Sequence, residues 1–200
     1  MPADPIQSER LRPTAPASRR LLSSAVIWLL MLSPSFAGDG PQILARPEWG
    51  AKPAIEARMI AQTPLEIVIH HTGMPKKAKL SLEKKLRGLQ NYSLGEKRWG
   101  DVPYHFYIDA QGRIGEGRSL AFAGDTNTKY DVRNRIQLVV EGNFEQETPG
   151  EAQLVPLREL VAWLRAKYAI AGAKVVGHGD LAQTDCPGKS LKPFLAELRK

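Results

Sequence analysis

Residues 102–117, VPYHFYIDAQGRIGEG, give the clearest indication of fold class in this chain. Two short runs rich in β-branched and aromatic residues flank Gln111-Gly112, and this pattern predicts a hairpin of two strands. Because the segments on either side alternate between strand and helix, a hairpin at this point indicates a mixed sheet.

Three further runs predict strands around the hairpin. LEIVIHH (65–71) is short and β-branched, which is typical of a buried strand. RIQLVVEGNF (135–144) is a second strand, closed by Gly142-Asn143. AKVVGH (173–178) is a third, and it ends on a histidine.

Helical spacing appears in two segments. Residues 80–94 contain Leu82, Leu86 and Leu89 on one side and lysines on the other. A second helix is predicted from Leu157 onward, with Pro156 in its first turn and an apolar face formed by Leu157, Leu160, Val161, Leu164 and Tyr168. A closing helix is expected over 193–198.

These elements predict an α/β fold with a central mixed β-sheet covered by helices. Two hundred residues favour one domain, and a composition that is 42% hydrophobic and 24% charged argues against a disordered or fibrous chain. Folds of this kind place their chemistry at strand ends. We therefore expect the functional site at one end or edge of the sheet.

The first 37 residues are typical of a secretory signal peptide. Four arginines precede LLSSAVIWLLML (21–32), an apolar run too short to span a bilayer comfortably. Ser35 and Ala37 fit a cleavage site, so we predict a signal peptide at 1–37 and an exported domain at 38–200, periplasmic or secreted and with no stable membrane anchor. An uncleaved anchor is the alternative, and SRRLL (18–22), loosely like a twin-arginine signal, leaves the export route open.

The charge of the predicted mature domain is mildly basic. Removing the four arginines and two acidic residues of 1–37 leaves 24 basic and 19 acidic residues, a net charge of +5. The basic residues lack the interleaved aromatic residues of a nucleic-acid-binding surface, so we expect no nucleic-acid partner. An anionic polymer such as a cell wall suits this charge, and so does an ordinary solvated surface.

Cys186 is the only cysteine of the chain, and it lies eight residues after His178. Cysteines of exported proteins usually pair in disulfides, and this one has no intramolecular partner. Four roles stay open: an inert core thiol, an intermolecular disulfide, a nucleophile with His178 as its base, and a metal ligand.

The four histidines, His70, His71, His105 and His178, fall on predicted strands or at their ends. Zinc binds imidazole nitrogens and thiolates in a tetrahedron, and catalytic sites leave one position open. His178 and Cys186 can supply two ligands from one loop, and His70 or His71 the third. Consecutive strand residues point to opposite faces, so only one of that pair can face the metal.

Four segments, taken in their order and spacing, resemble the zinc-dependent N-acetylmuramoyl-L-alanine amidases of type 2. This family includes phage lysozyme-type amidases and peptidoglycan recognition proteins. The segments are IVIHHT (67–72), VPYHFYIDAQGRIGEGR (102–118), EGNF (141–144) and GHGDLAQTDCPGKSL (177–191). ARPEWGAK (45–52) is similar to the segment that opens the recognition-protein domain, so the resemblance extends over residues 45–198.

The resemblance implies a zinc site formed by His70, His178 and Cys186. It also implies that Tyr104 lies beside the reacting water, and that Thr184 occupies a position held by lysine or threonine in active members. His71 and His105 would then face away from the metal or support it indirectly.

Three positions depart from the family pattern. Gly124-Asp125 stand where a histidine is expected, and NRIQLVV, from Asn134, replaces an N-x-x-S-I-G pattern. Val139 occupies a position that holds a glutamate base in some members, and Glu141, on the same strand face, is the candidate substitute.

The implied activity is hydrolysis of the amide bond between N-acetylmuramic acid and L-alanine, with Zn²⁺ as cofactor and peptidoglycan or a muropeptide as substrate. The alternative is a recognition module that binds muropeptide without cutting it. The retained ligands His70, His178 and Cys186, together with Tyr104, favour the enzyme. A structural zinc site, or a metallo-amidase with another substrate, is a third interpretation; a monomer is expected in each case.

Overall fold

The computed structural model describes residues 40–200. The predicted signal peptide, residues 1–37, lies outside the described residues. Among residues 40–200, no helix combines the length and the apolar character that a bilayer crossing requires.

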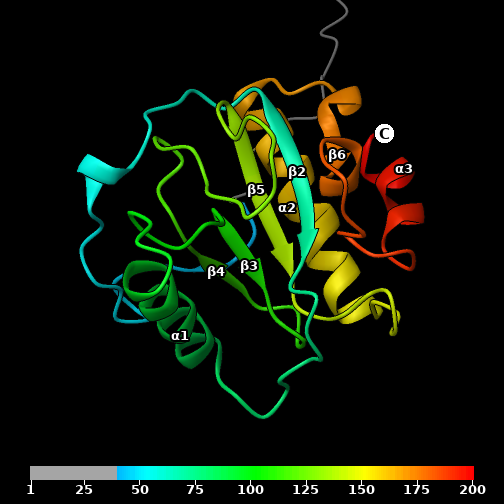
Figure 1. The fold of residues 1–200 in the computed structure, drawn as a ribbon. Coiled ribbons are helices and arrows are strands. Elements are labelled where there is room, and N and C mark those ends of the chain that lie inside the picture. Colours follow the sequence, from blue (N-terminus) through cyan, green and yellow to red (C-terminus); the bar gives the residue numbers. More distant parts are fainter. Residues whose placement is uncertain (1–39) are drawn as a thin grey trace, which may run out of the picture. The chain divides into compact units, whose positions relative to one another are not determined.

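Within the described part of the chain, six strands form one sheet in the order β1-β4-β3-β5-β2-β6 (Figure 1). The strands β3 and β4 are antiparallel, and every other neighbouring pair is parallel. The predicted mixed sheet is therefore confirmed. The strands are β1 (Ile43–Leu44), β2 (Glu66–His71), β3 (Phe106–Ile108), β4 (Ile114–Glu116), β5 (Arg135–Val140) and β6 (Val175–Gly177).

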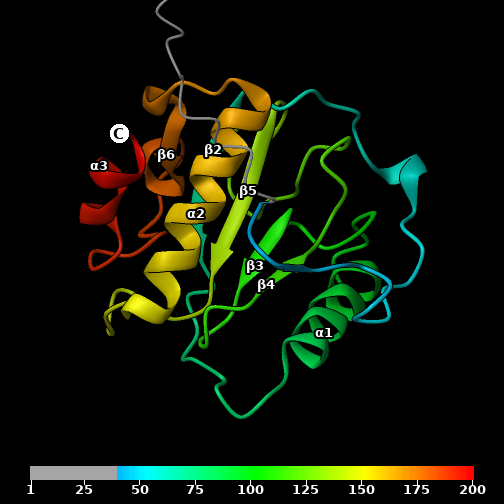
Figure 2. The same cartoon turned by 180° about the vertical axis from the view of Figure 1, so that it is seen from behind.

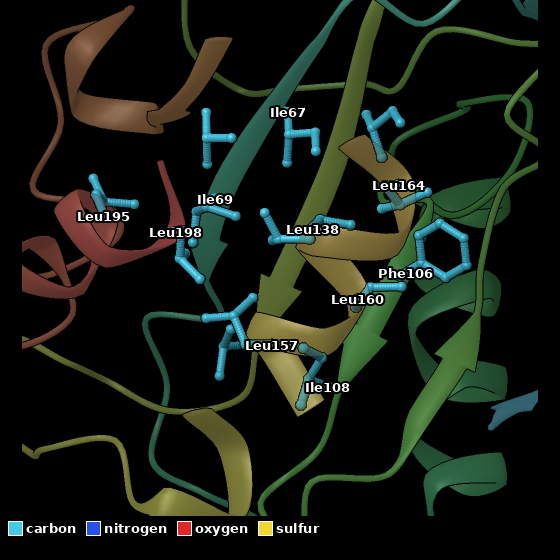
Figure 3. Close-up of a cluster of buried hydrophobic side chains, with 14 of the residues drawn as sticks. Ile67, Ile69, Phe106, Ile108, Leu138, Leu157, Leu160, Leu164, Leu195 and Leu198 are labelled. Atoms are coloured by element: carbon cyan, nitrogen blue, oxygen red, sulfur yellow. The ribbon is translucent and has the colours of Figure 1, made fainter. Parts of the chain in front are cut away.

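Helices cover both faces of this sheet. α2 (Glu151–Tyr168) and α3 (Leu195–Leu198) pack on one face, and the view from behind shows α2 lying across β5 (Figure 2). Isoleucines and leucines from the strands meet leucines from both helices there (Figure 3). The labelled members are Ile67, Ile69, Phe106, Ile108, Leu138, Leu157, Leu160, Leu164, Leu195 and Leu198.

The opposite face is covered by α1 (Leu82–Gly95). Ser81 caps this helix by accepting a hydrogen bond from the Lys84 N–H, which supplies a partner for one of the free donors of the first turn. Leu82 and Leu86, one helical turn apart, are both buried against the sheet. They form a second apolar cluster with Trp49, Tyr107 and Val139.

The start of α2 differs from the prediction. The helix begins at Glu151, so Pro156 lies inside it rather than in its first turn. A proline within a helix leaves the carbonyl four residues earlier, here that of Ala152, without its usual donor. Gly112, in the hairpin turn, packs against this carbonyl: its φ is 82°, and a Cβ there would lie 1.8 Å from Ala152 O. The packing of the hairpin turn on α2 therefore requires glycine.

Other boundaries are shorter than predicted. Residues 102–105 precede β3 and form no regular strand, and β5 ends at Val140 instead of continuing to 144. Gly142, with a φ of 147°, takes the chain out of the sheet after β5. Each predicted strand thus lies within its run and is shorter than that run.

A buried ion cluster joins α1 to the carboxyl end of β5 and to the hairpin. Lys85 Nζ lies 2.7 Å from Glu141 Oε2 and 3.8 Å from Asp109 Oδ2, and these three side chains are at most 3% exposed. Arg113 also pairs with Asp109 from the more exposed side of the hairpin. Glu141 therefore depends on Lys85 for its charge compensation in the interior, and Asp109 shares Lys85 with Arg113.

Candidate metal centre

β2 places His70 on the face of the sheet that α1 covers. Ile69 points to the opposite face, into the core under α2. In the parallel register of β2 and β5, His70 pairs with Val139, a member of the cluster beneath α1. His70 is only 4% exposed, so its imidazole requires polar partners in the interior.

The loop after β6 carries two more candidate ligands. His178 begins a short 3₁₀ turn directly after the strand, and Cys186 lies further along the same loop. The Gly179 N–H donates to the Cys186 carbonyl at 2.7 Å, which folds the loop back on itself. Gly188 fixes the end of the loop, because its φ is 94° and a Cβ there would lie 2.5 Å from the backbone of Phe144.

Donor atoms of His70, His178 and Cys186 lie within 4.8 Å of one another. Cys186 Sγ is 3.6 Å from His70 Nδ1, and the two imidazole rings are 4.6 Å apart between centroids. A tetrahedral zinc ion with bonds of about 2.0–2.3 Å holds its ligand atoms roughly 3.3–3.8 Å apart. The three residues therefore fit a zinc ion that keeps a fourth position open.

Each of the two histidines is held from outside the cluster. His70 Nε2 lies 2.6 Å from Gln137 Oε1, and His178 Nε2 lies 2.6 Å from Thr128 Oγ1. These contacts occupy both Nε2 atoms and leave Nδ1 of each ring available to a metal. Metal-binding histidines are commonly oriented in this way by a hydrogen bond to the other ring nitrogen.

Burial sets the protonation of the three donors in the metal-free protein. It lowers the pKa of His70 to about 3, with nearby His178 as the second cause, and it also lowers the pKa of His178. It raises the pKa of the Cys186 thiol to about 12. Near neutral pH both histidines are neutral, as ligands must be, whereas Cys186 has to lose its proton when a metal binds.

The donors face a cleft of about 250 Å³. A larger cleft of about 610 Å³ lies next to it, along α1, with lysine and apolar side chains in its wall. Thr72 and Tyr104 line both clefts, so the two volumes adjoin at these residues. A long ligand can therefore reach from the metal donors along α1.

Tyr104 and Thr184 line the smaller cleft together with the three donors, so the structure brings all five predicted site residues together. The Tyr104 ring lies 5.3 Å from the His70 ring, and burial raises the pKa of its hydroxyl, which keeps it protonated. Thr184 Oγ1 accepts a hydrogen bond from the Cys186 N–H at 3.3 Å, and its own proton remains available. Tyr104 and Thr184 thus each present a neutral hydroxyl to the cleft.

The remaining two histidines have structural partners. His71 Nδ1 accepts a hydrogen bond from the Phe144 N–H at 3.2 Å. His105 precedes β3 and is fully buried; its Nδ1 accepts from the Gln137 N–H at 2.8 Å, and its Nε2 lies 2.9 Å from the Phe122 carbonyl. Neither ring is one of the three clustered donors.

We expect His105 to make the fold sensitive to acid. Burial lowers its pKa from 6.5 to about 4, so it takes up a proton more readily in the unfolded chain than in the folded one. Its contribution is present above pH 6.5 and is lost as the pH falls from 6.5 towards 4. The expected loss is about 2 kcal/mol between pH 7 and pH 5.

Urea unfolding at a series of pH values tests this prediction. The free energy of unfolding of His105→Gln should fall less steeply over the same range than that of the wild-type protein. Parallel pH profiles for the two proteins would contradict it, whatever the difference in their stability at pH 7.

Glu141, the candidate base, is already engaged. Its Oε1 accepts from the Lys77 N–H at 2.7 Å, and its Oε2 accepts from the Lys85 ammonium at 2.7 Å and from the Ala110 N–H at 2.8 Å. A carboxylate with both oxygens bound in this way is a structural anion. The structure therefore does not support Glu141 as a proton shuttle.

Several residues in or next to the site were not predicted from the sequence. Gln137 and Thr128 hold the two histidines, Tyr130 donates to Gln137 Oε1, and Asp125 lines the cleft and is paired with the buried Arg118. No motif marks these positions. The alternation of residues along β5 gives the face on which Gln137 lies, but its pairing with β2 appears only in the folded sheet.

An α/β domain with two histidines and one cysteine beside an open cleft has the donor set and the accessibility that catalytic zinc proteins use. The family model described as N-acetylmuramoyl-L-alanine amidase matches residues 61–189, well over half of the chain. The chain therefore belongs to this family.

Three similar proteins illustrate its range. Peptidoglycan-recognition protein SD of Drosophila simulans is 30% identical over 167 residues, which cover 80% of this chain and 87% of that protein. The human N-acetylmuramoyl-L-alanine amidase is 30% identical over 166 residues, 78% of this chain and 28% of that protein. The solved structure of the amidase LysC from Clostridium intestinale is similar with a TM-score of 0.61 and 26% identity, over 79% of this chain and 97% of that chain.

Proposed function

We propose that this protein is a zinc-dependent amidase that hydrolyses the bond between the lactyl group of N-acetylmuramic acid and L-alanine in peptidoglycan. The observation that carries the proposal is the convergence of three donor atoms within 4.8 Å beside a cleft. Membership of the amidase family supports the choice of bond.

His70, His178 and Cys186 would hold the metal in this proposal. Zinc, when bound, supplies a Lewis acid and lowers the pKa of a water molecule towards 7. Two neutral imidazoles and one thiolate leave the centre with a net positive charge, which suits both effects. The Gly179–Cys186 hydrogen bond and the contacts of Gln137 and Thr128 keep the donors in place without any help from the substrate.

Tyr104 and Thr184 would act on the scissile amide. Their protonated hydroxyls can donate hydrogen bonds to the carbonyl oxygen as negative charge develops on it, which stabilises the transition state more than the substrate. Tyr104 stands where the two clefts adjoin. A substrate whose carbonyl lies at Tyr104 can therefore place its sugar or its peptide in the larger cleft beside α1.

Tyr104→Phe should lower kcat by about 10²–10³-fold while the protein keeps its zinc, because one donor to the developing charge is lost. The measurement is the rate of peptide release from purified muropeptide, with zinc content determined in parallel. Tyr168→Phe, at the end of α2 and in the wall of neither cleft, is the matched control and should behave as wild type. Equal rates for Tyr104→Phe and wild type would remove Tyr104 from the mechanism.

A second candidate function is recognition without cleavage, since a relative of 30% identity is named a peptidoglycan-recognition protein. Purified sacculi separate the two functions. An amidase releases peptides from the glycan, and a chelator stops the release; a recognition module sediments with the sacculi and releases nothing. Binding without any release in the presence of zinc would overturn the proposed activity.

We also propose that the domain acts outside the cytoplasm, at the cell wall or in the periplasm. The signal-peptide pattern of residues 1–37 and the net charge of +5 over the remaining chain support this location. Expression of the full chain followed by N-terminal sequencing of the exported product tests it. A mature protein that starts near Gly38 is the expected result.

A further inference from the structure

Gln137 is a fully buried polar residue in the middle of the sheet. It lies on β5, two residues before the partner of His70 in the strand register, and its side chain faces the same side as His70. Its Oε1 lies 2.6 Å from His70 Nε2 and also accepts a hydrogen bond from the Tyr130 hydroxyl at 3.1 Å. One oxygen atom thus links His70 to a ring that packs against His178 at 5.1 Å.

We propose that Gln137 is a positioning residue that holds the proton of His70 on Nε2 and so aims the Nδ1 lone pair at the metal. This inference rests on the proposed zinc site. A neutral imidazole has one N–H and one lone pair, and an amide oxygen can only accept. The contact with Gln137 Oε1 therefore places the proton on Nε2, and Nδ1 faces Cys186 Sγ at 3.6 Å as an acceptor.

The neighbours of Gln137 fix its backbone and leave room for its side chain. Its backbone forms two hydrogen bonds with His105. The Gln137 N–H donates to His105 Nδ1, and the His105 N–H donates to the Gln137 carbonyl. On the other side lies Gly124, where a Cβ would approach Gln137 Cγ to 2.6 Å and Pro103 O to 2.5 Å. The glycine leaves the space that the longer side chain fills, and this space lets the oxygen reach His70 Nε2.

The amide nitrogen of Gln137 argues that the residue serves more than packing. Nε2 is buried and has no hydrogen-bond partner among the described residues. A buried donor without a partner destabilises a fold, so packing alone would favour an apolar side chain at this position. An apolar side chain would lack the oxygen that accepts a hydrogen bond from His70 Nε2.

Gln137→Met removes this acceptor at nearly constant volume. We expect the dissociation constant for zinc, measured by competition with a chromophoric chelator, to rise about 10–100-fold. Gln137→Glu keeps an acceptor oxygen and should bind zinc at least as tightly as wild type. Gln153→Met is the matched control: Gln153 is equally buried and bonds to the Asp109 and Glu141 carbonyls, so its loss should lower Tm and leave the zinc affinity unchanged.

The tautomer of His70 gives a readout that needs no metal. Two-bond ¹H–¹⁵N correlation spectra of the metal-free wild-type protein should show the proton on Nε2, and Gln137→Met should reduce this preference. A proton on Nδ1 in the wild-type protein would overturn the inference, and so would unchanged zinc affinity in Gln137→Met or equal weakening in Gln137→Glu. Failure of the wild-type protein to bind zinc would instead refute the proposed function, and the spectra would still decide the role of Gln137.

Discussion

Cys186→Ser should remove stoichiometric zinc from the protein and reduce amide hydrolysis to the background rate. Zinc binds a thiolate strongly at about 2.3 Å, whereas a serine hydroxyl stays protonated near neutral pH and is a poor ligand. Only His70 and His178 would remain of the three donors that the structure brings together. Two neutral imidazoles on a buried site do not hold zinc at ordinary concentrations.

Zinc content by atomic absorption and peptide release from sacculi are the two measurements. His71→Asn is the control, because His71 neighbours a donor but bonds instead to the Phe144 N–H, which an asparagine oxygen can also accept. It should keep its zinc. Thermal unfolding of the metal-free proteins shows whether Cys186→Ser still folds, and one bound zinc per chain with full activity in that variant would refute the site.

Lys85→Met should lower the stability of the fold strongly, because it removes a buried positive charge from α1. Lys85 is the ammonium between Glu141 and Asp109 in the buried ion cluster. Removing one partner of a buried ion pair leaves an uncompensated charge and costs about 3–5 kcal/mol. For a domain of this size, this corresponds to a fall in Tm of roughly 6–20 °C.

Thermal unfolding measures this effect, and two variants define its cause. Lys84→Met, one residue earlier and exposed, should change the free energy of unfolding by less than about 0.5 kcal/mol. Adding Glu141→Gln to Lys85→Met removes the stranded charge and should restore part of the loss. If Lys85→Met unfolds at the temperature of Lys84→Met, the ion cluster does not stabilise the fold in the way described.

The local elements could be predicted from the sequence because their signals are local. β2 and α1 lie within two residues of the predicted ranges, since hydrophobic periodicity and the flanking turn residues mark them directly. The start of α2 was predicted wrongly because a proline is typical of a first helical turn, whereas here the helix begins five residues before Pro156. Strand order and register depend on pairings between distant segments.

The residues of the candidate site likewise fall into two groups, those that could be predicted from the sequence and those that could not. His70, His178 and Cys186 could be predicted because their residue types are rare in this chain and have specific chemistry. Gln137 and Thr128 could not, since a glutamine in a strand and a threonine in a loop have many ordinary explanations. Their importance comes from the atoms they face, and this depends on the register of β2 with β5 and on the path of the 123–130 loop.

The distance along the chain between the donors has a consequence for how the protein matures. His70 and Cys186 are 116 positions apart, and β2, which carries His70, lies between β5 and β6 in the sheet. The large apolar core beneath α2 contains no part of the donor cluster and can assemble without it. We therefore expect the polypeptide to reach its native topology first and to acquire its ion last, unlike small zinc fingers, in which the metal organises the chain.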